Sequence, residues 1–61
     1  MARWVGGGGH LVEAIRLDGR PLLRVSQYGY LVAYCRSVAE LAAHVALEDL
    51  VEVIPLRARD R

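Results

Sequence analysis

The stretch LVEAIRLDGRPLLRVSQYGYLVAYC, residues Leu11–Cys35, decides the fold of this chain. It consists of short apolar runs rich in β-branched and aromatic residues, separated by two glycine-containing pairs. Asp18-Gly19 is a strong hairpin signal, because a type I′ turn requires a positive φ at both of its central residues. Tyr28-Gly29 is a weaker signal of the same kind. The stretch therefore predicts three antiparallel strands joined by two tight turns.

The first turn fixes which residues of the first two strands lie opposite one another. A two-residue loop at Asp18-Gly19 places Glu13 opposite Arg24, and opposite charges stabilise such a cross-strand pair. A three-residue loop would place Glu13 opposite Val25 instead, which is less favourable. Pro21 has no N–H group, so it must occupy a strand position that donates no ladder hydrogen bond. The charge pairing therefore favours the two-residue turn.

The alternation of side chains along each strand then sorts the sheet into two faces. A two-residue turn at Tyr28-Gly29 would pair Val25 with Val32 and Leu23 with Tyr34. With this pairing neither face is clearly polar, although an antiparallel sheet usually has one solvated face. A single short helix can cover only one of the two faces. The other face is therefore expected to need a partner.

A helix is predicted after the third strand. Ser37–Glu40 matches a capping box, in which the serine oxygen accepts from the Glu40 amide and the glutamate carboxylate reaches back. Apolar residues follow at helical spacing, at Val38, Leu41, Ala42 and Val45. The apolar phase then changes, which predicts a helix end near Val45, a turn or 3₁₀ segment at 47–50 and a fourth strand at 51–54. One kinked helix reaching Ile54 is the alternative.

The two ends of the chain differ from this centre. Residues 1–9 are expected to form a flexible arm, because Gly6–Gly9 would lose much conformational entropy in regular structure. Trp4 on this arm would either dock onto the body or meet a partner. Residues 10–55 are expected to form a single α+β domain and residues 56–61 a charged tail. The predicted fold is thus a three-stranded antiparallel meander, one capped helix and a short C-terminal fourth strand.

The length of the chain limits the core that it can build. A chain of 61 residues buries only about 60% of the surface that its unfolded form exposes, so small domains often add disulfides, a metal or oligomerisation. The single cysteine, Cys35, permits no internal disulfide, and with His10 and His44 it forms no recognised metal-ligand pattern. Oligomerisation remains, and the 54% share of hydrophobic residues favours it. The sequence predicts a homodimer or a protein-bound subunit with contacts at Trp4, Leu11, Ile15, Leu17, Leu22 and Leu31.

No catalytic pattern emerges from the residues. The glycine run lacks the following Lys-Ser/Thr of a phosphate-binding P-loop. Cys35 in an apolar strand is typical of a buried small hydrophobe rather than of a reactive thiol. We therefore expect a small non-enzymatic protein-interaction or regulatory module, without a cofactor or a bound metal.

Arginines and tyrosines suggest an alternative function. Arginine beside aromatic residues on a sheet can bind a phosphodiester backbone and stack bases, so a nucleic-acid-binding regulator would use Arg16, Arg20, Arg24, Arg36 and Tyr28. The net charge of +1 gives little long-range attraction to nucleic acid. All eight basic residues are arginine, a bias that a GC-rich genome explains equally well. No membrane helix or secretory signal is predicted, so a cytoplasmic location is expected.

Overall fold

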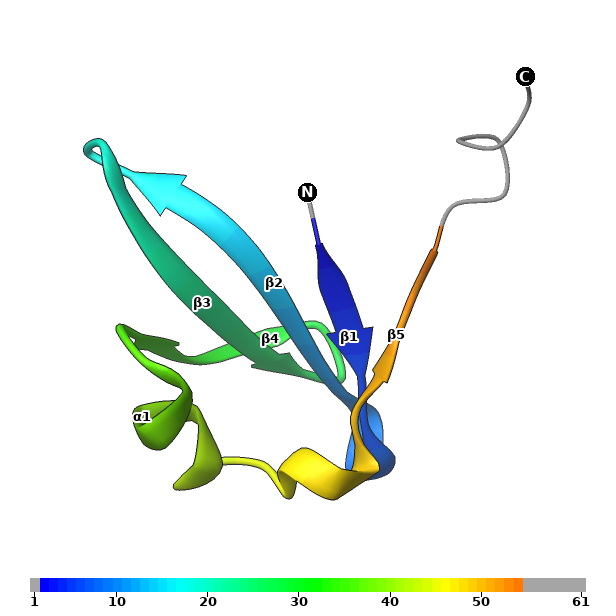
Figure 1. Ribbon diagram of the computed structural model, residues 1–61. Helices are drawn as coiled ribbons and strands as arrows, with labels where there is room; N and C mark the ends of the chain where they lie inside the picture. The colour runs from blue at the N-terminus through cyan, green and yellow to red at the C-terminus, as the bar shows by residue number, and fades with distance from the viewer. Residues whose placement is uncertain (1, 55–61) are drawn as a thin grey trace.

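The computed structural model describes residues 2–54, which form one five-stranded antiparallel sheet and a short helix (Figure 1). The strands are β1 (Arg3–Val5), β2 (His10–Leu17), β3 (Arg20–Gln27), β4 (Tyr30–Cys35) and β5 (Val51–Glu52). Their order across the sheet is β4-β3-β2-β1-β5. The helical segments are η1 (Gly7–Gly9), α1 (Val38–Ala42) and η2 (Leu47–Asp49), of which η1 and η2 are 3₁₀ turns.

The predicted fold class is wrong, because the sheet has five strands instead of a three-stranded meander and one further strand. The unpredicted strand is β1, which pairs with β2 so that Trp4 lies opposite Val12. On its other side β1 pairs with β5, and there Trp4 lies opposite Glu52. The Val53 amide continues this edge by donating to the Arg3 carbonyl at 2.9 Å. Residues ahead of the glycine run are therefore an integral part of the sheet.

The glycine run is the connection that returns the chain from β1 to β2. Gly8 and Gly9 have φ angles of 75° and 79°, in the left-handed region that residues other than glycine rarely adopt. The Gly7 carbonyl accepts from His10 Nδ1–H at 2.9 Å. The Gly8 carbonyl accepts from Gln27 Nε2 at 2.9 Å, and the Gly9 carbonyl accepts from the Tyr28 amide at 3.0 Å. Because successive backbone carbonyls are satisfied in this way, the loop is held against the β2–β3–β4 end of the sheet.

The two predicted turns are present with two-residue loops. Asp18 and Gly19 have φ angles of 53° and 78°, and Tyr28 and Gly29 have φ angles of 51° and 86°, as type I′ turns require. The β2–β3 register pairs Glu13 with Arg24, as the charge argument predicted. In Figure 1 this hairpin extends beyond the neighbouring strands, so its tip stands apart from the helical side of the molecule.

The β3–β4 register differs from the prediction because it contains a bulge between Val25 and Ser26. Val25 lies opposite Ala33 instead of Val32, and Leu23 lies opposite Cys35 instead of Tyr34. One extra residue on β4 moves every later side chain to the other face. Cys35 therefore enters the core, and Tyr34 points to the opposite side of the sheet.

The α1 helix begins as predicted and ends earlier. Ser37 Oγ accepts from the Glu40 amide at 3.1 Å, while the Glu40 carboxylate accepts from the Arg36 amide at 2.9 Å, one residue before the position usual in a capping box. After Ala42 the helix tightens, because the amides of the next two residues bond to carbonyls three positions back. The segments η2 and β5 follow, so the alternative of one helix to Ile54 is wrong.

The core lies between one face of the sheet and the segment formed by α1 and η2. Its buried residues are Val12, Val25, Cys35, Leu41 and Val45. Partly buried side chains pack around them, namely Trp4, Leu23, Ala33, Leu47 and Leu50. We call this side of the sheet the covered face. The predicted tail at 56–61 lies outside the described residues. Among the described residues, no helix is long and apolar enough to cross a membrane.

Candidate interaction surface

The side of the sheet opposite the core forms a second surface, which we call the open face. The strand registers and the alternation of side chains define its members. It carries Arg3, Val5, Leu11, Glu13, Ile15, Leu17, Arg20, Leu22, Arg24, Ser26, Leu31, Tyr34 and Val51. Among residues 2–54 both α1 and η2 pack against the other side. The open face is therefore the larger uncovered part of the sheet.

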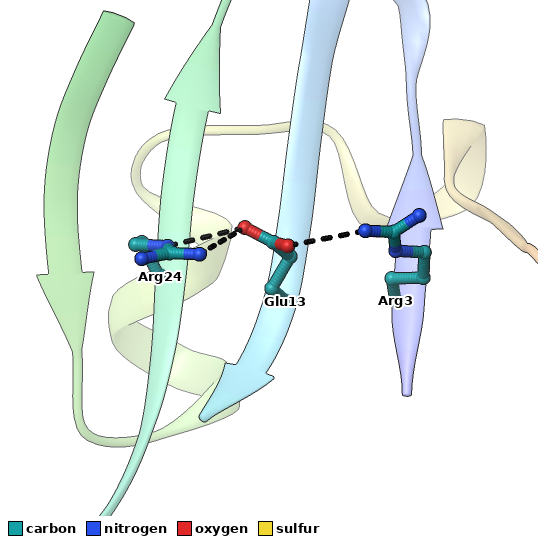
Figure 2. Close-up of polar contacts among 3 residues, drawn as sticks. All are labelled: Arg3, Glu13 and Arg24. Atoms are coloured by element: carbon teal, nitrogen blue, oxygen red, sulfur yellow. Dashed lines mark hydrogen bonds and ion pairs between the residues drawn. The ribbon is translucent and has the colours of Figure 1, made fainter. Parts of the chain in front are cut away.

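A charged row crosses the middle of the open face (Figure 2). Arg24 donates two hydrogen bonds to Glu13 Oε1, from Nε at 3.1 Å and from Nη2 at 2.8 Å. Arg3 Nη2 donates to Glu13 Oε2 at 3.4 Å from the other neighbouring strand. The Glu13 side chain is only 19% exposed, whereas the side chains of Arg3 and Arg24 are 53% and 41% exposed. The carboxylate is therefore the least hydrated member of the row. The row links β1, β2 and β3 through one carboxylate.

The two arginines change the acidity of the carboxyl group between them. The hydrogen bonds from Arg24 lower the pKa of Glu13 below its ordinary value, and the charges of Arg24 and Arg3 act in the same direction. Partial burial opposes this effect and is outweighed. Glu13 in turn raises the pKa of Arg24. The carboxylate therefore stays ionised to a lower pH than an ordinary glutamate does.

Apolar side chains lie on both sides of the charged row. Toward the glycine loop lie Val51, Val5, Leu11 and Leu31, in a line across the sheet that Ser26 interrupts at β3. Toward the Asp18-Gly19 turn lie Ile15, Leu22 and Leu17. Several are strongly exposed, with Val51 at 64% and Leu31 at 56%. Beside the row, a hollow of about 320 Å³ is lined by Leu11, Glu13, Arg24, Ser26, Gly29 and Leu31. Exposed apolar surface of this kind marks a candidate protein-interaction site.

The structure brings five of the six predicted contact residues together. Leu11, Ile15, Leu17, Leu22 and Leu31 all lie on the open face. Trp4 does not, because it lies on the covered face and packs against the core. Of the two predicted roles for Trp4, the structure shows docking onto the body. Strand β1 was missed, since a strand of three residues carries too little local signal. A strand at Val51 was predicted, but its place beside β1 and its contribution to the open face were not.

The arginines proposed for nucleic acid do not form one surface. Arg24 is paired with Glu13 on the open face, whereas Arg16 lies on the opposite side and donates to the Gly19 carbonyl at 2.9 Å. Arg20 lies opposite Leu17 at the hairpin end and therefore shares the open face with Arg24, two pleats away along β3. Arg36 immediately precedes the helix cap, and Tyr28 occupies the second turn. No shared groove for a phosphate backbone follows from these positions.

The remaining candidate groups are accounted for by structure. Cys35 is buried, and burial raises the pKa of its thiol, with the Glu40 charge acting in the same direction. His10 is hydrogen-bonded to the glycine loop through Nδ1. Within residues 2–54, no three or more His, Cys, Asp and Glu side chains gather as they would around a metal ion.

Comparisons with known proteins give no match, whether to a family model, to a curated protein or to a solved structure. The two faces of the sheet are therefore the features of the molecule that bear on its function.

Proposed function

We propose that this protein is a non-enzymatic interaction module that forms a homodimer through its open face. The observation that supports this proposal is the exposure of apolar side chains on both sides of the charged row, including Val51 at 64%, Leu31 at 56% and Leu17 at 46%. Monomeric proteins seldom leave continuous apolar patches larger than a few hundred Å² in water. A second copy of the chain offers an apolar surface of the same kind.

The area available is large enough to matter energetically. The open face carries seven aliphatic side chains, Val5, Leu11, Ile15, Leu17, Leu22, Leu31 and Val51. If each loses about 50 Å² on association, the hydrophobic gain is roughly 9 kcal/mol per protomer at about 25 cal/mol per Å². Loss of translational and rotational freedom opposes association by an estimated 4–15 kcal/mol. Two protomers together gain about 18 kcal/mol, which exceeds this cost, so the balance favours a dimer.

The charged row supports a defined interface rather than unspecific adhesion. In a twofold dimer the same patch serves both copies, so each side must complement itself. Glu13 already accepts hydrogen bonds from Arg24 and Arg3 within one protomer. Covering a hydrogen-bonded pair costs less free energy than covering an unpaired charge. Because each row holds two arginines and one glutamate, placing one row directly over the other would bring like charges together, which restricts how the two sheets can align.

The proposal is tested with two neighbouring positions on β4. Leu31 lies opposite Ser26 on the open face, whereas Tyr30 lies opposite Gln27 and points to the other side. Both are exposed, at 56% and 79%, so neither Leu31→Lys nor Tyr30→Lys creates a cavity. A charge at the interface must be desolvated on association. We expect Leu31→Lys to weaken the dimer by about 100-fold, equivalent to about 2.7 kcal/mol, and Tyr30→Lys to leave it unchanged.

The measurement is molar mass by light scattering behind a sizing column, across a hundredfold range of protein concentration. The wild type and Tyr30→Lys are expected at twice the 6.8 kDa chain mass, and Leu31→Lys at the single-chain mass over most of the range. Far-UV circular dichroism shows whether each variant keeps its sheet. A wild type that remains at the mass of one chain throughout contradicts the proposal, as does an equal effect of both substitutions.

A further inference from the structure

The other side of the sheet holds an apolar cleft that the dimer proposal does not use. It lies between the sheet and the α1–η2 segment and is lined by Trp4, Leu23, Val38, Leu41, Leu47 and Leu50. Its volume is about 300 Å³, the space of about ten water molecules at about 30 Å³ each. One large apolar side chain fits into that space. Val38 at its mouth is 59% exposed, so the cleft is open to solvent.

Three acidic residues are close neighbours of members of this apolar lining, along the chain or across the sheet. Glu48 and Asp49 lie in η2 between two lining residues, Leu47 and Leu50. Glu52 lies directly across from Trp4 in the β1–β5 pair and therefore on the same face. All three acidic side chains are exposed. The sequence from Ser37 to Ile54 contains no lysine or arginine, and within residues 2–54 the recorded ion pairs involve Glu13 only.

We infer that this cleft binds a basic segment of a partner protein, with one apolar side chain in the cleft and flanking arginines or lysines against Glu48, Asp49 and Glu52. An apolar side chain alone would gain hydrophobic contact in the cleft but no attraction from the acidic rim formed by Glu48, Asp49 and Glu52. A phosphate backbone or an acidic segment would be repelled by the rim. A basic segment with one apolar anchor is the ligand whose chemistry complements both parts.

The cleft and the open face lie on opposite sides of the sheet, so both can be used together. In a dimer formed through the open faces, each covered face points outward and its cleft stays accessible. The inference therefore goes beyond the proposed dimer and does not depend on it. Since the rim is exposed, its attraction for a basic segment is screened by salt over a Debye length of about 10 Å at 0.1 M. Binding should accordingly weaken as salt is added.

The cleft contains its own probe, because Trp4 is the only tryptophan of the chain. A blocked hexapeptide with one central leucine and three arginines is titrated into the protein while Trp4 emission is recorded. Two matched peptides carry alanine in place of leucine, or glutamate in place of each arginine. We expect a saturable emission change with the first peptide and at least tenfold weaker binding of the other two. No saturable change with the first peptide up to millimolar concentration overturns the inference, as does equal binding of the glutamate peptide.

Two protein variants locate the binding surface. The triple variant Glu48→Gln, Asp49→Asn and Glu52→Gln removes only exposed charges, so it should fold normally and bind the arginine peptide at least tenfold more weakly. Leu31→Lys changes only the open face and should bind the peptide as the wild type does. If Leu31→Lys abolishes dimerisation and keeps peptide binding, the two surfaces act separately. If the triple variant binds as tightly as the wild type, the rim does not select the ligand and the inference is wrong.

Discussion

Glu13 on β2 links three neighbouring strands through its side chain. Its carboxylate receives Arg24 from β3 and Arg3 from β1. Isolated ion pairs at a protein surface contribute little, since water and salt screen them. Here the geometry is better than average, because Arg24 donates through two nitrogens and the Glu13 side chain is only 19% exposed. The row therefore stabilises the pairing of the central strands as well as shaping the open face.

Replacing Glu13 by glutamine should destabilise the fold by about 1 kcal/mol at neutral pH, because the charge-assisted hydrogen bonds are lost. The pKa of Glu13 is lowered in the folded state. Its contribution is therefore complete above the unfolded-state pKa and is lost as the pH falls through the lower folded-state pKa. Thermal melts of the wild type and Glu13→Gln should differ above about pH 5 and converge toward about pH 2.

Glu48→Gln provides the control for this comparison, since Glu48 is exposed and lies away from the charged row. Its melting temperature should follow that of the wild type at every pH, at one fixed protein concentration. A gap between wild type and Glu13→Gln that stays constant down to the lowest pH contradicts an ionic origin of the stabilisation.

At the scale of elements, the loop η1 makes β1 part of the sheet. Gly9 has a φ of 79°, and a Cβ atom added there would lie within 2.3 Å of the Tyr28 ring. Gly7 has open space around its Cα and a φ that other residues adopt. We expect Gly9→Ala to destabilise the protein by about 1–2 kcal/mol through backbone strain and displacement of the ring.

Gly7→Ala is the matched control and should change stability by less than about 0.5 kcal/mol. Urea denaturation followed by Trp4 emission measures both, because Trp4 lies in the strand that this loop positions. Equal stability of the two variants would show that the loop tolerates a side chain at Gly9 and does not hold β1 in place through this contact.

Elements with a strong local signal could be predicted from the sequence, and elements that depend on distant pairing could not. Asp18-Gly19, the Glu13–Arg24 register and the Ser37 cap each follow from a few neighbouring residues. By contrast, β1 is three residues long and is recognisable only once β2 and β5 lie beside it. The bulge near Val32 is likewise a property of the β3–β4 pair.

The candidate surface was predicted to a similar extent. The apolar alternation of β2 and β3 placed Leu11, Ile15 and Leu22 on one face, as the structure does. The missing contribution of Arg3 follows from the missing strand. Tyr34 was assigned to the wrong face because the bulge reverses the alternation along β4. The wrong β3–β4 register therefore led directly to a wrong assignment of residues to the open face.

At the scale of the whole molecule, the small core connects stability to association. Only five side chains are buried among the described residues, and Val12, Val25 and Cys35 are the largest that are fully enclosed. A domain of this size has a marginal core, while its open face keeps apolar surface that a second copy would remove from water. Folding and dimerisation are thus expected to be thermodynamically linked.

This linkage predicts a melting temperature that depends on protein concentration. When only the folded chain dimerises, mass action stabilises it further as concentration rises. Over a hundredfold range the wild type should gain about 10 °C in Tm, from the entropy of unfolding typical for this chain length. Leu31→Lys weakens the association, so its Tm should change little over the range in which it is monomeric, whereas Tyr30→Lys should follow the wild type. Differential scanning calorimetry at matched concentrations measures all three. A wild-type Tm that does not move with concentration would mean that the core alone holds the fold, and that the apolar open face is not buried by a second copy.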